Sequence, residues 1–101
     1  MISIQVIPSH GIDAYKILRE KVTHSATTWY WGNKSKSRLR HSQVKKGYIK
    51  VTKADGILLA QIRPKEPKDH FYLSEKFIGR LIAWFEDRLV AINIHFISDG
   101  K

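Results

Sequence analysis

The chain has 101 residues, 43% of them apolar and none of them cysteine, and 18 Lys and Arg against 9 Asp and Glu give it a net charge of +9. This length predicts one domain, residues 1–101, with a single hydrophobic core, and the lack of cysteine excludes a disulfide framework, a thiol nucleophile and the common cysteine-based zinc sites. The excess of positive charge favours an anionic partner, nucleic acid above all.

Neither end of the chain resembles a membrane or export segment. The first residues lack the cationic start and the long apolar run of a signal peptide. The most apolar stretch near the C-terminus is broken by Asn93 and His95. We therefore expect a cytoplasmic protein with no membrane partner.

The chain begins with a strand and a helix. Apolar residues at alternate positions predict a strand over residues 2–7. A helix is expected over about residues 10–23, because its apolar residues recur at spacings of three and four. Ser9 is the expected N-terminal cap of this helix.

The next strand leads into the most basic part of the chain. Residues 26–31 are rich in threonine and aromatic residues, which favours a strand. Its period of two puts Trp29 and Trp31 on one face and Tyr30 on the other, and we expect at least one tryptophan to lie in the core. Residues 33–47 leave three structures open: a further strand, an ordered loop, or an arm that settles only on a partner.

A β-hairpin is the clearest local pattern. The Asp-Gly pair at 55–56 predicts a two-residue turn between strands over 48–53 and 57–63. Pairing Ala54 with Ile57 makes one face of the hairpin apolar, so this register is self-consistent. The other face then carries Tyr48, Lys50, Thr52, Leu59, Gln61 and Arg63.

The last third of the chain predicts a helix and a strand. After a loop over 64–69, Ser74 is the expected cap of the second helix, with Glu75 well placed in its first turn. Gly79 inside this helix indicates a close neighbour that needs the space. Residues 89–97 return to a period of two with apolar residues on both faces near the start, which is typical of a central strand.

This order of elements predicts an α+β fold. We expect a two-layer sandwich in which two helices pack on a mainly antiparallel sheet of four or five strands. A ferredoxin-like βαββαβ order fits this prediction. An extra strand within residues 38–44 would disturb that order.

The positive charge is concentrated in one segment. Residues 29–53 contain eight cations and no acid, while the rest of the chain is nearly balanced. Four of these cations stand at successive even positions from Lys34 to Arg40, so in an extended segment they would point the same way about 6.6 Å apart. That repeat is comparable to the spacing of phosphates along a nucleic-acid strand.

We therefore predict a small basic nucleic-acid-binding module. Aromatic residues beside the cations can stack bases, which suits single-stranded or loop RNA better than duplex DNA. The expected contact residues are Lys34, Lys36, Arg38, Arg40, Lys45, Lys46, Lys50, Trp29 and Tyr48.

Two other functions stay open. His41 beside Arg40 can act as general base or acid in metal-independent RNA cleavage of the toxin type, with His70 as a second histidine. We expect a binding protein rather than an enzyme. The third reading is a scaffold or homodimer that contacts its copy through a strand edge or the tryptophan face, while its basic loop docks an acidic protein.

No metal or cofactor is expected. No two histidines have the spacing of a helical metal site, and acidic residues are not grouped with them. The chain also contains no glycine-rich phosphate-binding motif and no nucleophile motif.

Overall fold

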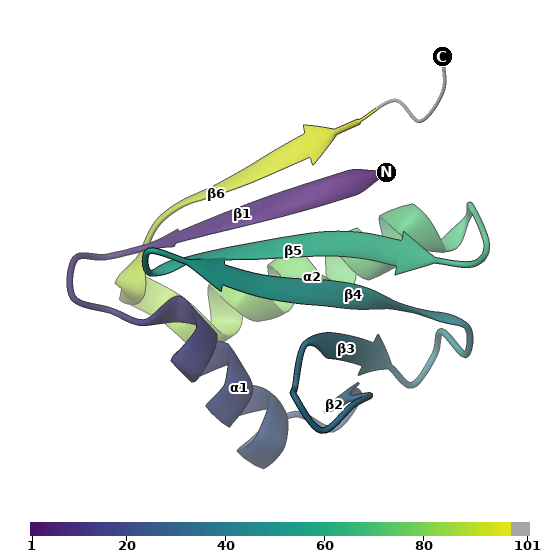
Figure 1. Ribbon diagram of the computed structural model, residues 1–101, viewed down its shortest axis with the longest axis horizontal. Helices are drawn as coiled ribbons and strands as arrows, with labels where there is room; N and C mark the ends of the chain where they lie inside the picture. Colours follow the sequence, from purple (N-terminus) through teal and green to yellow (C-terminus); the bar gives the residue numbers. More distant parts are fainter. Residues whose placement is uncertain (98–101) are drawn as a thin grey trace.

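A computed structural model describes residues 1–97. All six strands join one antiparallel sheet in the order β2-β3-β4-β5-β1-β6 (Figure 1). The α+β sandwich is therefore confirmed, but its sheet is larger than the four or five strands expected. In chain order the elements are β1 (Ile2–Pro8), α1 (Ala14–His24), β2 (Trp29–Trp31), β3 (Arg38–His41), β4 (Gly47–Ala54), β5 (Ile57–Pro64), α2 (Asp69–Phe85), the 3-10 turn η1 (Glu86–Arg88) and β6 (Leu89–Phe96).

The additional strand comes from the basic segment. Asn33 organises the turn between β2 and β3, because its side-chain oxygen accepts hydrogen bonds from the backbone N–H of Ser37 (3.1 Å) and of Arg38 (3.0 Å). The chain then runs back along β2 as β3 and pairs with β4 on its other side. Residues 33–47 are thus a turn, a short strand and a loop.

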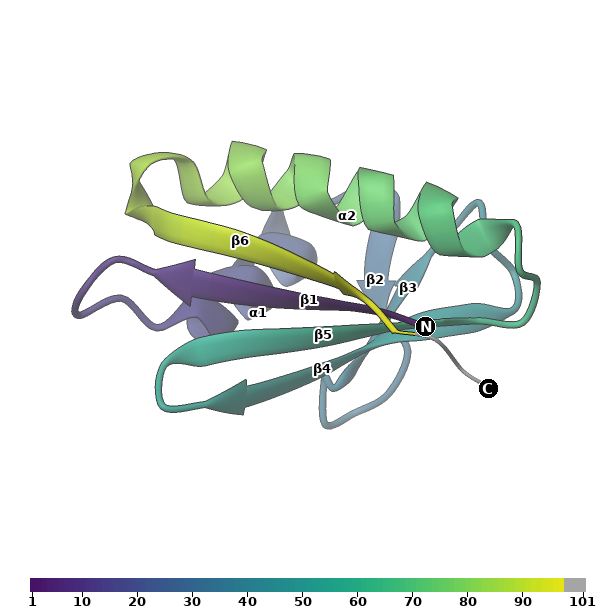
Figure 2. The same ribbon diagram turned by 90° about the horizontal axis from the view of Figure 1, so that it is seen from above.

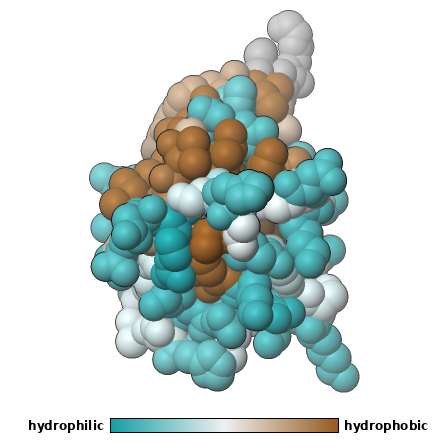
Figure 3. Space-filling model, turned by 90° about the vertical axis from the view of Figure 1, so that its left-hand side faces the viewer, coloured by the Kyte–Doolittle hydropathy of each residue, from teal (hydrophilic) through white to brown (hydrophobic). Residues whose placement is uncertain are grey.

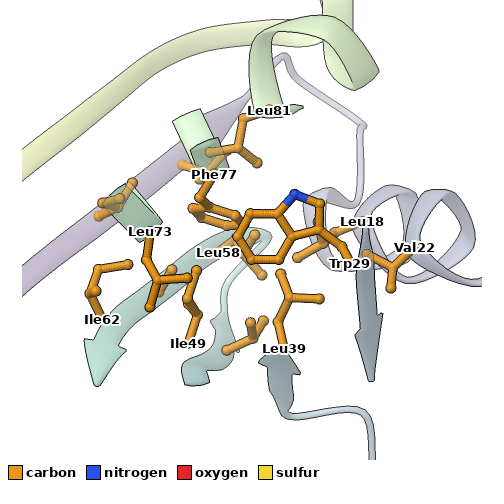
Figure 4. Close-up of a cluster of buried hydrophobic side chains, with 14 of the residues drawn as sticks. Leu18, Val22, Trp29, Leu39, Ile49, Leu58, Ile62, Leu73, Phe77 and Leu81 are labelled. Atoms are coloured by element: carbon orange, nitrogen blue, oxygen red, sulfur yellow. The ribbon is translucent and has the colours of Figure 1, made fainter. Parts of the chain in front are cut away.

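Both helices cover the same face of the sheet. Strand residues at alternate positions join the residues of α1 and α2 in one buried cluster. Figure 2 shows α2 running along one side of the strands, and Figure 4 shows Trp29 in the middle of the cluster, with its ring centroid 6.0 Å from that of Phe77. Within the described residues 1–97, no helix covers the opposite face of the sheet. Within residues 1–97 neither helix is long and apolar enough to cross a membrane.

The predicted register of the hairpin is confirmed. Ala54 pairs with Ile57, and Ile49 pairs with Ile62. Asp55 and Gly56 have φ angles of 53° and 79°, as a two-residue turn with both central residues left-handed requires.

The start of α1 differs from the prediction. The helix begins at Ala14, after Asp13, whose carboxylate accepts a hydrogen bond from the Lys16 N–H at 3.1 Å. Ser9 belongs instead to a turn in which its carbonyl accepts the N–H of Ile12. Gly11 in this turn has φ of 82° and Asp13 is extended, with φ of −92° and ψ of 103°, so the helix begins only after Asp13.

Two expectations about α2 are wrong. Ser74 is not a cap, because the helix starts at Asp69 and the buried Ser74 hydroxyl donates to the His70 carbonyl one turn earlier (2.7 Å). A serine inside a helix commonly satisfies its hydroxyl in this way. Gly79 has no close neighbour, since a Cβ atom added there would meet nothing within 4 Å.

The strand predicted to be central lies at the edge of the sheet. β6 pairs with β1 only and forms the upper edge in Figure 1. Because none of the described strands or helices covers the apolar residues of β6, Val90 is 68% exposed and Phe96 is 71% exposed. An edge position is thus combined with a sequence typical of a sheet centre.

Candidate nucleic-acid interface

Cations and a tyrosine meet on the open face of the sheet. Arg38 in β3 pairs with Lys50 in β4, and Tyr48 in β4 pairs with Arg63 in β5. Paired residues of an antiparallel sheet point to the same side, and successive residues point to opposite sides. Arg40, two residues after Arg38, therefore also points to the face that the helices leave uncovered.

This face is hollowed where β3, β4 and β5 lie side by side. A hollow of 530 Å³, here called the cationic hollow, has Tyr48 in its lining together with six cations: Arg38, Arg40, Lys45, Lys46, Arg63 and Lys65. An adjoining hollow of 340 Å³ shares Arg38, Tyr48 and Arg63 with it and adds Lys50. Neither lining contains a carboxylate.

The arginines of the cationic hollow bond to neutral groups. The Arg38 guanidinium lies over the Tyr48 ring, 4.7 Å from its centroid. Arg40 donates to the Lys45 carbonyl (3.3 Å), and Arg63 donates to the side-chain oxygen of Gln61 (3.1 Å). Within residues 1–97 none of the three forms an ion pair with a carboxylate, so their charge is left to attract anions.

Two glycines let the walls of the hollow approach each other. Gly47 opens β4 with φ of 113°, and a Cβ there would lie 2.5 Å from the Pro64 Cα at the end of β5. A Cβ at Gly32 would lie 2.6 Å from the Cδ of Arg40. Glycine at these positions therefore makes room for the close backbone and for the arginine stem.

The expected row of four cations is interrupted. Lys36 has φ of 54°, which turns the chain and ends any extended run, so only Arg38 and Arg40 share a strand and a direction. Lys34 is exposed in the turn before β3. The nearby serine hydroxyls accept hydrogen bonds from the Asn33 amide at 2.8–2.9 Å, which ties them into the turn.

Trp29 does not belong to the interface. Its side chain is 3% exposed and packs under the helices, so its ring is not available to stack a base. Trp31 on the same face is half-buried, with its ring centroid 6.3 Å from that of Tyr15 in α1. Tyr48 is the aromatic residue that lines the cationic hollow, and Tyr30, which pairs with Arg40 on the same face, is exposed beside it.

His41 lies on the helix-covered face, away from the cationic hollow. Its side chain is 5% exposed, and its ring centroid lies 4.6 Å from that of Trp29 and 5.5 Å from that of Tyr72. Its Nδ1 atom accepts a hydrogen bond from the Gln43 N–H at 3.0 Å. Burial, and secondly the positive charge of Lys76, lower the pKa of this imidazole, which therefore favours the neutral form.

The second candidate histidine is elsewhere again. His70 lies in the first turn of α2, with Nδ1 3.1 Å from the Pro67 carbonyl. It lines an apolar hollow with Phe71 and Phe96, of which His41 is not a part. The two histidines thus form no catalytic pair. Among residues 1–97 no group of three or more His, Asp or Glu is arranged to hold a metal ion.

The structure adds two cations that sequence reasoning left out of the site. Arg63 was recoverable, because the hairpin register places it opposite Tyr48. Lys65 had no such signal, since it follows β5 in a loop, where its N–H donates to the Lys46 carbonyl (3.4 Å). Both line the cationic hollow.

The chain has no significant match among protein-family models, curated proteins or solved structures.

Proposed function

We propose that this protein binds single-stranded or loop RNA across the open face of its sheet. The observation that carries the proposal is the cationic hollow, in which six cations surround a tyrosine and no carboxylate takes part. Cations that are not neutralised locally are available to replace the counterions of a phosphate backbone.

Each group in the hollow has a distinct task. Arg38, Arg63 and the flanking lysines contact phosphates, because charge-assisted hydrogen bonds to phosphate are strong and guanidinium groups make them in pairs. Tyr48 stacks on a base that has left its helical stack. Splayed bases occur in single strands and loops, which is why RNA of this kind suits the site better than duplex DNA. Because most of these contacts are to the phosphate backbone of the RNA, binding should show little sequence preference.

The sheet order supports a narrower description of the fold. We infer that β1, α1, β4, β5, α2 and β6 form a ferredoxin-like βαββαβ unit, to which β2 and β3 add a hairpin beside β4. That hairpin brings Arg38 and Arg40 to the open face. We also propose a cytoplasmic location, which suits an RNA-binding role and is compatible with the absence of cysteine.

Fluorescence anisotropy with a labelled single-stranded RNA tests the proposal. Affinity should fall steeply as salt is added, and Arg63→Ala should weaken binding and reduce the slope of log K against log salt by about 0.7. The matched control is Arg80→Ala, an exposed arginine of α2 outside both hollows, which should leave the slope unchanged. Affinity that ignores salt, or an equal effect of both variants, would overturn the proposal.

Competitors separate RNA from other anions. Polyglutamate and duplex DNA of equal charge should displace the RNA only at much higher concentration, because neither offers splayed bases to Tyr48. Equal competition by polyglutamate would favour an acidic protein partner instead. Recovery of the RNA from the same samples in chelator should show intact strands, since His41 does not reach the hollow.

A further inference from the structure

The outer edge of β6 is long and, apart from one bulge near its start, carries none of the features that usually prevent association. Residues 89–96 contain no Lys, Arg, Asp or Glu, and no proline or glycine. Exposed sheet edges in native proteins are commonly blunted by charges, proline, bulges or short length. The one bulge of β6 lies near its start, where it pairs with Ile7 and Pro8, so the rest of the edge is regular.

Two apolar stripes lie beside this edge and remain exposed. One follows the helix-side face of β6, and the other follows α2. They meet where α2 passes through η1 into β6, and again at the other end, where Phe71 and Phe96 line one hollow of 460 Å³. Figure 3 looks at the first of these ends and shows the apolar surface gathered in its upper part, on the side of β6. The exposed members are Phe71, Ile82, Val90, Ile94, Phe96 and Ile97, at 41–71% exposure.

The backbone of β6 is also ready to pair. Met1 and Ile97 exchange both backbone hydrogen bonds at 2.8 Å, and such pairs alternate along an antiparallel ladder. The N–H and C=O groups of Ile92, Ile94 and Phe96 therefore point away from β1, toward the open edge. These same residues carry apolar side chains on the helix-side face.

We propose that β6 pairs with β6 of a second copy of this chain, so that one antiparallel sheet runs through a two-fold symmetric dimer. An antiparallel edge is complementary to itself under a two-fold axis, and no other partner is needed to match it. The pairing also accounts for the sequence of β6, which has the apolar character of a central strand. In the dimer, β6 becomes a central strand of the continuous sheet.

The available surface is close to what a stable dimer needs. Since an aromatic side chain contributes about 150–250 Å² and an aliphatic one somewhat less, the six exposed apolar residues present roughly 600 Å² per copy. A standard interface takes about 800 Å² from each partner, and the backbone edge with the flanking half-buried residues supplies the remainder. A single apolar patch of this size is at the upper limit for a monomer.

Charge does not oppose this contact. The net charge of +9 is concentrated in residues 29–53, which form β2, β3 and β4 at the opposite end of the sheet order. Two copies joined through β6 keep their cationic hollows apart, so their mutual repulsion is screened over that distance.

Light scattering after size exclusion tests the dimer on the full chain without RNA. Wild type should have twice the 11.7 kDa mass of one chain, and Val90→Lys should raise the dissociation constant at least tenfold. The matched control is Thr23→Lys, which adds the same charge to an exposed position of α1 and should remain dimeric. A wild-type monomer at the highest concentration reached, or a Val90→Lys dimer as tight as wild type, overturns the proposal.

A cysteine variant locates the contact independently of folding losses in Val90→Lys. The natural chain has no cysteine, and opposed Cα atoms of a strand pair are about 4.5–5.5 Å apart, within the range of a disulfide. Ile94 is the middle one of the three residues whose backbone groups point outward, so we place the two-fold axis there, which sets Ile94 opposite its own copy. Ile94→Cys should therefore cross-link as a dimer under mild oxidation, whereas Thr23→Cys should not. Failure of Ile94→Cys to cross-link while the protein is dimeric would place the interface elsewhere and overturn the proposal.

Discussion

Arg40 and His41 are neighbours in β3, and the two-residue period of a strand sends them to opposite faces of the sheet. Arg40 reaches the cationic hollow, where its Nε atom is buried without a hydrogen-bond partner. One terminal nitrogen of its guanidinium group donates a hydrogen bond to the Lys45 carbonyl. His41 enters the core instead and is 5% exposed. Adjacent residues thus serve binding on one side and packing on the other.

The burial of His41 makes stability depend on pH. Its pKa in the folded protein lies below the ordinary value of 6.5, because of burial and of Lys76. The unfolded chain therefore takes up a proton on this imidazole at a higher pH than the native protein does, so stability is full above pH 6.5 and falls as pH drops below it. The loss is at most about 1.4 kcal/mol for each pH unit.

Urea unfolding of wild type and His41→Asn between neutral and mildly acidic pH measures this effect. The asparagine oxygen can replace Nδ1 as acceptor for the Gln43 N–H, but it does not titrate. The variant should lose less stability than wild type on acidification. Parallel pH profiles would show that His41 does not titrate in this range.

Tyr48 is the residue on which stacking depends. Its ring has Arg38 over it at 4.7 Å and lines both hollows of the open face. Tyr48→Ala should weaken RNA binding by about 1–3 kcal/mol, whereas Tyr48→Phe should retain most of the affinity because the ring persists. An anisotropy titration at fixed salt measures both, and equal losses in the two variants would assign the contact to the hydroxyl rather than to the ring.

At the scale of elements, the hairpin of β2 and β3 carries much of the site. Its turn is held by Asn33, and its second strand supplies Arg38 and Arg40. β4 and β5 supply Tyr48 and Arg63, and the loops before β4 and after β5 supply Lys45, Lys46 and Lys65. Each element contributes one or two groups, and the sheet brings them within one hollow.

Replacing glycine by alanine should have opposite effects on stability at two positions. Gly79→Ala should stabilise the protein by about 0.5–1 kcal/mol, since the position is helical and a Cβ meets nothing within 4 Å. Gly47→Ala should destabilise it by about 1–3 kcal/mol, because φ of 113° strains any other residue and the Cβ would lie 2.5 Å from the Pro64 Cα. Urea unfolding of the two variants provides the comparison, and a shift of the same sign in both would contradict it.

At the scale of the whole molecule, the sheet separates two surfaces. The cationic hollow lies over β3 to β5, and the apolar edge lies at β6. A two-fold axis perpendicular to a continuous sheet would turn both open faces to the same side. The dimer would then offer two cationic hollows to one RNA strand.

This arrangement predicts a dependence on RNA length. A single strand long enough to span both hollows should bind wild type at least about tenfold more tightly than a short one, because the second contact is intramolecular. Val90→Lys should lose this gain while keeping the affinity of wild type for the short strand. Anisotropy titrations with a series of lengths measure the effect, and a gain that persists in Val90→Lys would mean that one copy binds the longer strand alone.

Local patterns in the chain were sufficient for much of the architecture. Alternation of apolar residues, the Asp-Gly turn and the position of the cations predicted the α+β class, the hairpin register and a basic surface that includes Arg38 and Tyr48. These features depend on residues close together in sequence. The same patterns misplaced the helix starts at Ser9 and Ser74, because a serine before an apolar run marks a cap only when the backbone ahead of it is not already helical or turned.

Only the tertiary structure decided which elements are neighbours. Periodicity shows that β6 has two apolar faces, but a strand of that kind lies at a centre or at an edge depending on what segments far away in the chain do. The same holds for Arg63, which reaches the hollow of Arg38 through its pairing with Tyr48, and for Lys65, which reaches it from the loop after β5. It holds also for His41, whose face is set by the register of β3. Side-chain direction is a local property of a strand, whereas the partner beside it is a property of the whole sheet.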